Sequence, residues 1–172
     1  GNQDQIVSIG AFYATAYDPE SGDEIWYVRY DGFSNVPSPV YGGGVVYIAT
    51  GFPLPALVAV RVDGEGDVSR THVEWVRQRS IPFTSSPLLV GEEIYIVSDI
   101  GVISCLDAAT GDVIWQQRVV GNYSASPTYA DGRIYFLSEE GVATVIAPGT
   151  EYRLLTSNRL DGWTLASMAV SG

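Results

Sequence analysis

The sequence predicts an all-β fold built from about four copies of one repeating unit. Glycine accounts for 19 of the 172 residues and tyrosine for 11, a composition that favours strands and turns. No segment keeps a 3.6-residue apolar period over the length of a helix, so essentially no helix is expected. At this length, residues 1–172 are expected to form a single domain.

Landmark residues recur along the chain at spacings of 40 to 48 residues. Ser-Pro pairs begin at Ser38, Ser86 and Ser126, and a further serine, Ser167, follows 41 residues after the last of them. Strand-forming tyrosines repeat in step with these pairs, at Tyr47, Tyr95 and Tyr135. A β-rich period of about 40 residues is typical of propeller blades, each made of four strands. The sequence therefore predicts a β-propeller of about four blade equivalents.

The last full unit shows where each strand is expected to begin and end. A proline opens the first strand over residues 126–130, since proline is tolerated at a first strand position. Asp131 and a following glycine make a tight hairpin turn into the second strand, residues 133–138. A second glycine turn leads to the third strand, residues 142–147, and the fourth begins at Tyr152.

The same plan applied to the whole chain predicts sixteen strands. Full blades are expected at about residues 38–79, 86–119 and 126–160. Residues 5–30 supply only three strands of a split blade, and residues 165–170 supply a single first strand of the kind that would complete it. Sharing one blade between two termini closes a propeller ring and covers its edge strands.

Two segments carry the same decapeptide pattern between the third and fourth strands. They are Leu106-Asp-Ala-Ala-Thr-Gly-Asp-Val-Ile-Trp115 and Tyr17-Asp-Pro-Glu-Ser-Gly-Asp-Glu-Ile-Trp26. A third copy, over residues 62–75, is loosened by an insertion, and a fourth, over residues 146–153, has lost both its aspartate and its tryptophan. The proposed motif residues are Asp18, Gly22, Trp26, Asp63, Gly66, Trp75, Asp107, Thr110, Gly111 and Trp115.

These segments closely match the tryptophan-docking motif of PQQ-like (quinoprotein-type) propeller repeats, and the chain resembles BamB-like proteins of the bacterial cell envelope. The resemblance implies a non-catalytic scaffold or protein-interaction module in the periplasm or cell envelope, with no cofactor. It also implies protein partners. Because relatives of this type close their rings with seven or eight blades, the chain is expected either to be half of a longer propeller or to pair with a second copy into an eight-bladed ring. Two alternatives remain open: a fragment of a larger quinoprotein-like enzyme or sensor with its site elsewhere, and small-molecule or sugar binding at the axial opening.

The residues that could support catalysis are few. Quinoprotein dehydrogenases bind PQQ with calcium and often use adjacent cysteines, whereas this chain has one cysteine, Cys105, expected to be a buried thiol. The acidic segment Asp63-Gly-Glu-Gly-Asp67 is expected to be a solvated turn, not a calcium site, because the later ligands of an EF-hand are absent. His72, the single histidine, is expected to lie exposed in a loop, without a nucleophile motif nearby.

The charge balance and the hydropathy argue against two kinds of partner, nucleic acid and the interior of a membrane. The chain has 20 acidic residues and nine basic ones, all arginine, for a net charge of −11, which disfavours nucleic acid. No apolar run is long enough to span a membrane, and the first residues do not read as a signal peptide.

Irregular apolar segments are the candidate interaction surface. The loop over residues 51–56 contains Phe52, Pro53, Leu54 and Pro55, and it is expected to form a contact patch or to plug the axial channel. Trp163 falls outside the repeat motif, and both a surface contact and ordinary packing remain open for it.

Overall fold

The computed structural model describes residues 4–171, and within them the chain forms strands and no helix. The all-β prediction is therefore confirmed. The strands are β1 (Ile6–Ile9), β2 (Tyr13–Tyr17), β3 (Glu24–Arg29), β4 (Val40–Gly42), β5 (Val45–Ala49), β6 (Leu57–Arg61), β7 (Gly66–Asp67), β8 (Val73–Arg77), β9 (Leu88–Val90), β10 (Glu93–Val97), β11 (Val102–Asp107), β12 (Val113–Arg118), β13 (Thr128–Ala130), β14 (Arg133–Leu137), β15 (Val142–Ala147) and β16 (Arg153–Arg159).

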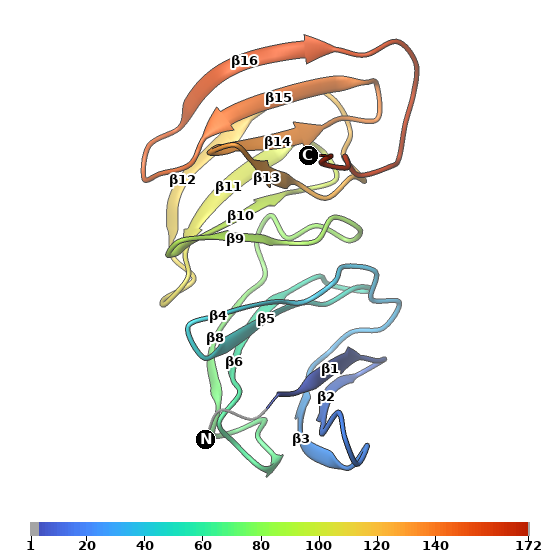
Figure 1. The fold of residues 1–172 in the computed structure, drawn as a ribbon, viewed down its shortest axis with the longest axis vertical. Coiled ribbons are helices and arrows are strands. Elements are labelled where there is room, and N and C mark those ends of the chain that lie inside the picture. The colour runs from blue at the N-terminus through green and yellow to red at the C-terminus, as the bar shows by residue number, and fades with distance from the viewer. Residues whose placement is uncertain (1–3, 172) are drawn as a thin grey trace.

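The strands form four separate four-stranded sheets, which we call blades 1 to 4 in chain order. Their strand orders are β1-β2-β3-β7, β4-β5-β6-β8, β9-β10-β11-β12 and β13-β14-β15-β16. Figure 1 shows the blades following one another along the molecule, with blade 1 at one end and blade 4 at the other. The innermost strands β4, β9 and β13 contact one another in turn, which sets the blades side by side as in a propeller.

The hydrophobic core lies between successive blades, because facing sheets bury their apolar side chains against each other. Three clusters of buried side chains fill the three spaces between the four blades. Their largest fully buried members are Trp26, Ile48, Leu57, Ile94, Ile96, Leu106, Tyr95, Tyr123, Ile103, Ile134, Phe136 and Ile146. A fourth, smaller cluster of Ala125, Leu137 and Ala143 packs against Met168 on blade 4.

The expectation of a strand over residues 165–170 is wrong for the single chain, because this segment is described and forms no strand. A strand needs a neighbour with a free edge, and the free inner edge of blade 1, β1, lies at the opposite end of the molecule (Figure 1). The total of sixteen strands is reached in a different way, by β7. This short strand lies in an insertion of blade 2 and pairs in parallel with β3 of blade 1.

The segment nevertheless continues a ladder that links the blades. The amide of Ser38 donates to the Ser86 hydroxyl at 2.9 Å, and the amide of Ser86 donates to the Ser126 hydroxyl at 3.0 Å. The amide of Ser126 donates in turn to the hydroxyl of Ser167 at 2.9 Å. Residues 165–170 therefore occupy the place of a first strand beside blade 4, although they have no sheet to join there.

Candidate functional site

In blades 1 and 3 the repeat motif closes the turn after the third repeat strand through an aspartate. The Asp107 carboxylate accepts hydrogen bonds from the amides of Ala109 and Thr110, both at 2.9 Å, and the amide of Gly111 donates to the Asp107 carbonyl at 2.8 Å. Asp18 receives the corresponding amides at 2.8 and 3.0 Å. Glycine completes the turn because its φ is positive, +73° at Gly111.

The motif tryptophans anchor each blade to the next one. The indole of Trp75 donates to the carbonyl of Ala108 at 3.1 Å, and the hydroxyl of Tyr47 donates to the same oxygen at 3.1 Å. One blade later, the indole of Trp115 donates to the carbonyl of Gly149 at 2.9 Å. Each tryptophan therefore packs at a blade boundary and satisfies a backbone acceptor of its neighbour.

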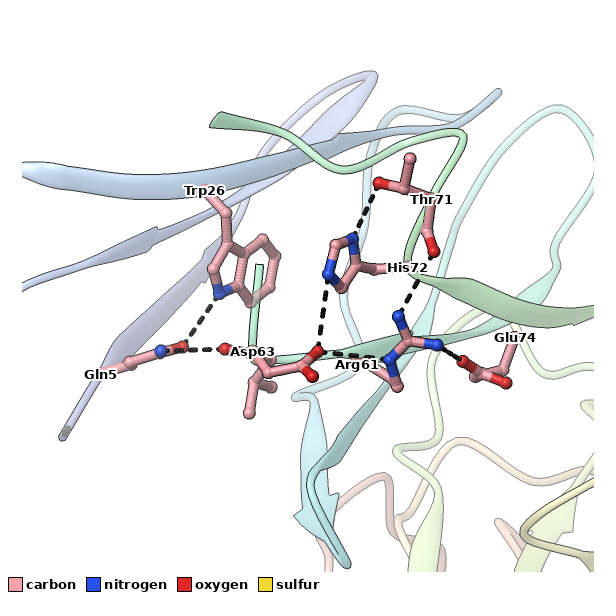
Figure 2. Close-up of polar contacts among 8 residues, drawn as sticks. Gln5, Trp26, Arg61, Asp63, Thr71, His72 and Glu74 are labelled. Atoms are coloured by element: carbon pink, nitrogen blue, oxygen red, sulfur yellow. Dashed lines mark hydrogen bonds and ion pairs between the residues drawn. The ribbon is translucent and has the colours of Figure 1, made fainter. Parts of the chain in front are cut away.

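Blade 1 makes the same connection by a different route, which Figure 2 shows. Val7 pairs with Ala16 where later blades have a tyrosine, so the hydroxyl is missing. Trp26, fully buried, donates at 2.9 Å to the side-chain oxygen of Gln5, whose amide nitrogen donates at 3.1 Å to the carbonyl of Val62. Sequence reasoning missed Gln5, and the loss of a tyrosine at Val7 was the signal that a substitute donor was needed.

The third motif copy is corrected by the strand register. Ala59 and Cys105 both pair with a tyrosine of the second strand, and Arg61 follows Ala59 as Asp107 follows Cys105. Arg61, not Asp63, therefore takes the position of the motif aspartate. The insertion after it displaces the turn, which explains why the sequence pattern pointed to Asp63.

The insertion is held to blade 2 by a polar cluster (Figure 2). Arg61 pairs with Asp63 at 3.2 Å and also with Glu74, while Asp63 lies 3.5 Å from Nε2 of His72. The Thr71 hydroxyl contacts Nδ1 of His72 at 2.8 Å. The His72 side chain is only 20% exposed, so the expectation of an exposed histidine is wrong. The cluster therefore pairs the charged side chains of the insertion with one another. The hydrogen bond from Arg61 lowers the pKa of Asp63.

Gly66 and Asp67, within this insertion, form β7. Asp67 lies 3.4 Å from the guanidinium of Arg29 on blade 1, and its carboxylate also accepts hydrogen bonds from Ser69. These hydrogen bonds lower the pKa of Asp67. The insertion therefore ties blade 2 to the outer edge of blade 1.

Blade 4 keeps part of the anchoring pattern on a face that no other blade of the chain covers. Tyr135 pairs with Val145 as Tyr95 pairs with Cys105, and Thr156 stands opposite Val145, in the place of the motif tryptophan. Tyr135 is half-buried, whereas Tyr95 is fully buried against blade 4. A shallow hollow of about 350 Å³ opens here, lined by Arg133, Tyr135, Val145, Leu155, Thr156 and Asn158.

The apolar residues singled out in the sequence lie on the surface. Phe52 and Leu54, in the loop between β5 and β6, are 55% and 68% exposed, and Trp163, after β16, is 66% exposed. Pro53 is exposed and Pro55 half-buried in the same loop. Phe33 contacts Phe52 from the loop between β3 and β4 and was not singled out by the sequence. A binding role for these residues stays a prediction.

Among residues 4–171, no cluster of three or more His, Cys, Asp or Glu side chains is arranged to hold a metal ion. The same part of the chain has no helix with the length and apolar character needed to cross a membrane.

Comparisons with solved structures agree with the propeller architecture. BamB from Moraxella catarrhalis is similar over 95% of this chain and 50% of its own length, with a TM-score of 0.73 and 19% identity. The β-propeller domain of Cps50 (Swd1) from Myceliophteria thermophila matches 90% of this chain and 56% of its own, with a TM-score of 0.63 and 11% identity. A europium-containing methanol dehydrogenase matches 75% of this chain and 25% of its own, with a TM-score of 0.61 and 13% identity.

The chain thus spans about half the length of the BamB structure that it resembles. No curated protein sequence matches it closely. The model of the family described as outer membrane protein assembly factor BamB matches residues 11–162, nearly the whole run of blades. The chain is a PQQ-like β-propeller protein that belongs to this BamB family.

Proposed function

We propose that this protein is a non-catalytic interaction module of the bacterial cell envelope, acting in the periplasm as a scaffold for other proteins. The family supports the compartment and the scaffold role. The observation that carries the proposal is the open face of blade 4. Tyr135 repeats the anchoring tyrosines of two closed blade boundaries, yet here it lines an exposed hollow.

A second copy is the partner that the two end faces favour. Residues 165–170 already hold the place of a first strand through Ser167, and β1 of blade 1 has a free inner edge. Pairing 165–170 of one copy with β1 of another would complete the split blade, and two such contacts would give an eight-bladed ring. Blade 1 of the second copy would then cover Tyr135 of blade 4, as blade 4 covers Tyr95 of blade 3 within one chain.

Sedimentation and X-ray scattering of the purified chain test the ring. The expected result is a closed particle of twice the mass of the chain, which Tyr135→Glu converts to a monomer. The control Tyr129→Ser, a change at a 45% exposed tyrosine on β13, should leave the particle intact. A compact monomer at every concentration would contradict the ring.

The scaffold role is tested separately, by site-specific crosslinking of the chain to proteins of an isolated cell envelope. Crosslinks at defined surface positions are expected to yield specific protein adducts. A titration with PQQ and calcium, followed by absorbance, tests the opposing enzyme hypothesis. Stoichiometric binding of PQQ in that titration would argue against a non-catalytic module.

A further inference from the structure

Three exposed phenylalanines form a continuous row across blades 1 and 2. We call Phe12, Phe33 and Phe52 the phenylalanine row. Their ring centroids are 5.9 Å apart from Phe12 to Phe33 and 5.3 Å apart from Phe33 to Phe52. Their side chains are 57%, 37% and 55% exposed, and Leu54 in the last loop is 68% exposed. Contiguous exposed apolar surface of this kind marks binding sites on soluble proteins.

The loops that carry the row are fixed to one another. The side-chain amide of Asn35 donates to the carbonyl of Gly10 at 2.7 Å and to the hydroxyl of Tyr30 at 3.1 Å, and its oxygen accepts the amide of Gly51. The amide of Phe33 donates to the carbonyl of Phe52 at 2.9 Å, which makes an isolated antiparallel bridge between the loops. The row is therefore presented on a preorganised backbone, which reduces the entropy cost of binding.

Phe12 occupies a backbone conformation that blades 3 and 4 give to glycine. The carbonyls of Phe12, Gly101 and Gly141 each accept a hydrogen bond from a backbone amide. The donors are the residues that directly follow β3, β12 and β16, respectively. All three have positive φ, +69° at Phe12, +81° at Gly101 and +80° at Gly141. An aromatic residue in the left-handed region costs about 1–2 kcal/mol relative to glycine. Strained residues of this kind cluster at functional sites, and the exposed ring of Phe12 therefore supports a binding role for this surface.

The surroundings of the row identify the chemistry of its occupant. The three loops that carry the row join β1 to β2, β3 to β4 and β5 to β6. They contain none of the nine arginines but do contain Asp31, and the whole chain has a net charge of −11. The rings are tilted by 50° and 65° to one another, so they offer no flat platform for a sugar ring. The Asn35 side chain, which could bind sugar hydroxyls, is already bonded within the loops.

We propose that the phenylalanine row binds an apolar segment of a partner protein that is flanked by lysine or arginine. The apolar side chains pack among the three rings, and the basic flank faces the exposed carboxylate of Asp31. This inference rests on the proposed interaction function and names the surface and the partner chemistry for it.

A peptide array with defined sequences tests the proposal. The probes are short segments with an aliphatic or aromatic centre and basic, neutral or acidic flanks, with chitohexaose as a sugar probe. The wild-type chain is expected to bind the apolar peptides with basic flanks, and Phe12→Gly and Phe52→Ser should each weaken this binding by about tenfold or more. Asp31→Asn and added salt should weaken binding to the basic-flanked peptides alone.

Tyr41→Ser is the matched control, because Tyr41 is an aromatic residue on β4 that is 65% exposed and lies outside the row. Thermal unfolding of every variant checks that the fold is kept, and Phe12→Gly should melt no lower than the wild type. The proposal is overturned if no peptide binds, if the row variants bind as tightly as the control, or if only chitohexaose binds. Envelope crosslinks that persist in both row variants would leave the scaffold function standing while rejecting this surface.

Discussion

The indole of Trp115 and the hydroxyl of Tyr95 converge on one acceptor, the carbonyl oxygen of Gly149, at 2.9 and 3.5 Å. The amide of Gly149 donates back to the Tyr95 hydroxyl at 2.7 Å. Two aromatic side chains of blade 3 therefore clamp both polar groups of a single residue in blade 4. This arrangement makes the blade boundary dependent on hydrogen bonds as well as on apolar contact.

Trp115→Phe and Tyr95→Phe are expected to destabilise the protein through this clamp. Each should lower the free energy of unfolding by about 1–3 kcal/mol, because a backbone group at the boundary loses its partner. The double variant should lose more than the sum, because each single variant leaves the Gly149 carbonyl one of its two donors and only the double variant removes both. Urea denaturation measures all three values, and strictly additive losses would contradict a shared clamp.

Gln5→Leu tests the substitute connection in blade 1. The change leaves the indole nitrogen of fully buried Trp26 without its acceptor, and an unsatisfied buried donor costs about 1–3 kcal/mol. Gln5→Glu keeps an acceptor for the indole but loses the donor to Val62, so it should cost less than Gln5→Leu. Urea denaturation at neutral pH compares the two. Equal stability of Gln5→Leu and the wild type would show that the bridge is dispensable.

Gly22→Ala and Gly111→Ala separate backbone strain from steric overlap. Both glycines have positive φ, +77° and +73°, so both changes should cost about 1–2 kcal/mol through strain. A Cβ at Gly22 meets nothing within 4 Å, whereas a Cβ at Gly111 would lie 2.6 Å from the indole of Trp75. Gly111→Ala should therefore cost about 1–3 kcal/mol more. Thermal unfolding measures the stability of both variants. Equal losses of stability would show that close packing against Trp75 does not restrict Gly111.

Stability is expected to fall as the pH rises above about 9. Burial raises the pKa of Cys105 to about 11 from its ordinary value of 9.0, and burial also raises the pKa of Tyr95. The unfolded chain therefore loses these protons at lower pH than the folded chain, so the folded state binds more protons in that range and loses stability with increasing pH. Melting temperatures from pH 7 to 10.5 measure the decline.

Cys105→Ala is the control for the thiol contribution, and it should make the decline between pH 9 and 11 shallower. The native thiol should also react slowly with an aromatic disulfide reagent at pH 8, because the thiol is buried and the thiolate is the reactive form. Rapid reaction of the folded protein at that pH would contradict the burial argument.

Much of the architecture could be predicted because local sequence patterns specify it. Turn glycines, the spacing of Ser126 and Ser167, and the decapeptide ending at Trp115 repeat in the sequence, and each repeat encodes one blade. Residues whose role depends on the neighbouring blade were harder to predict. Gln5 has no repeat partner, and its role becomes clear where the structure places its side chain beside Trp26.

The phenylalanine row shows the same limit at the candidate binding surface. Phe52 was singled out because its own loop is apolar, but Phe12 and Phe33 stand 40 and 19 residues earlier in the sequence. Only packing of blade 1 against blade 2 brings the three rings together. The left-handed backbone at Phe12 likewise has no signal in the sequence, because phenylalanine rarely adopts positive φ.

The sequence by itself determined the fold class, the repeat and the two complete copies of the Asp–Trp pattern, over residues 17–26 and 106–115, because period, turn chemistry and strand patterning are local properties of a chain. The tertiary structure decided which side chains meet across blade boundaries: Arg61 in place of Asp63, β7 in place of a strand at 165–170, and Tyr135 left on an open face. These outcomes depend on contacts between segments far apart in sequence, where insertions shift the register and a free edge pairs only with a strand that can reach it.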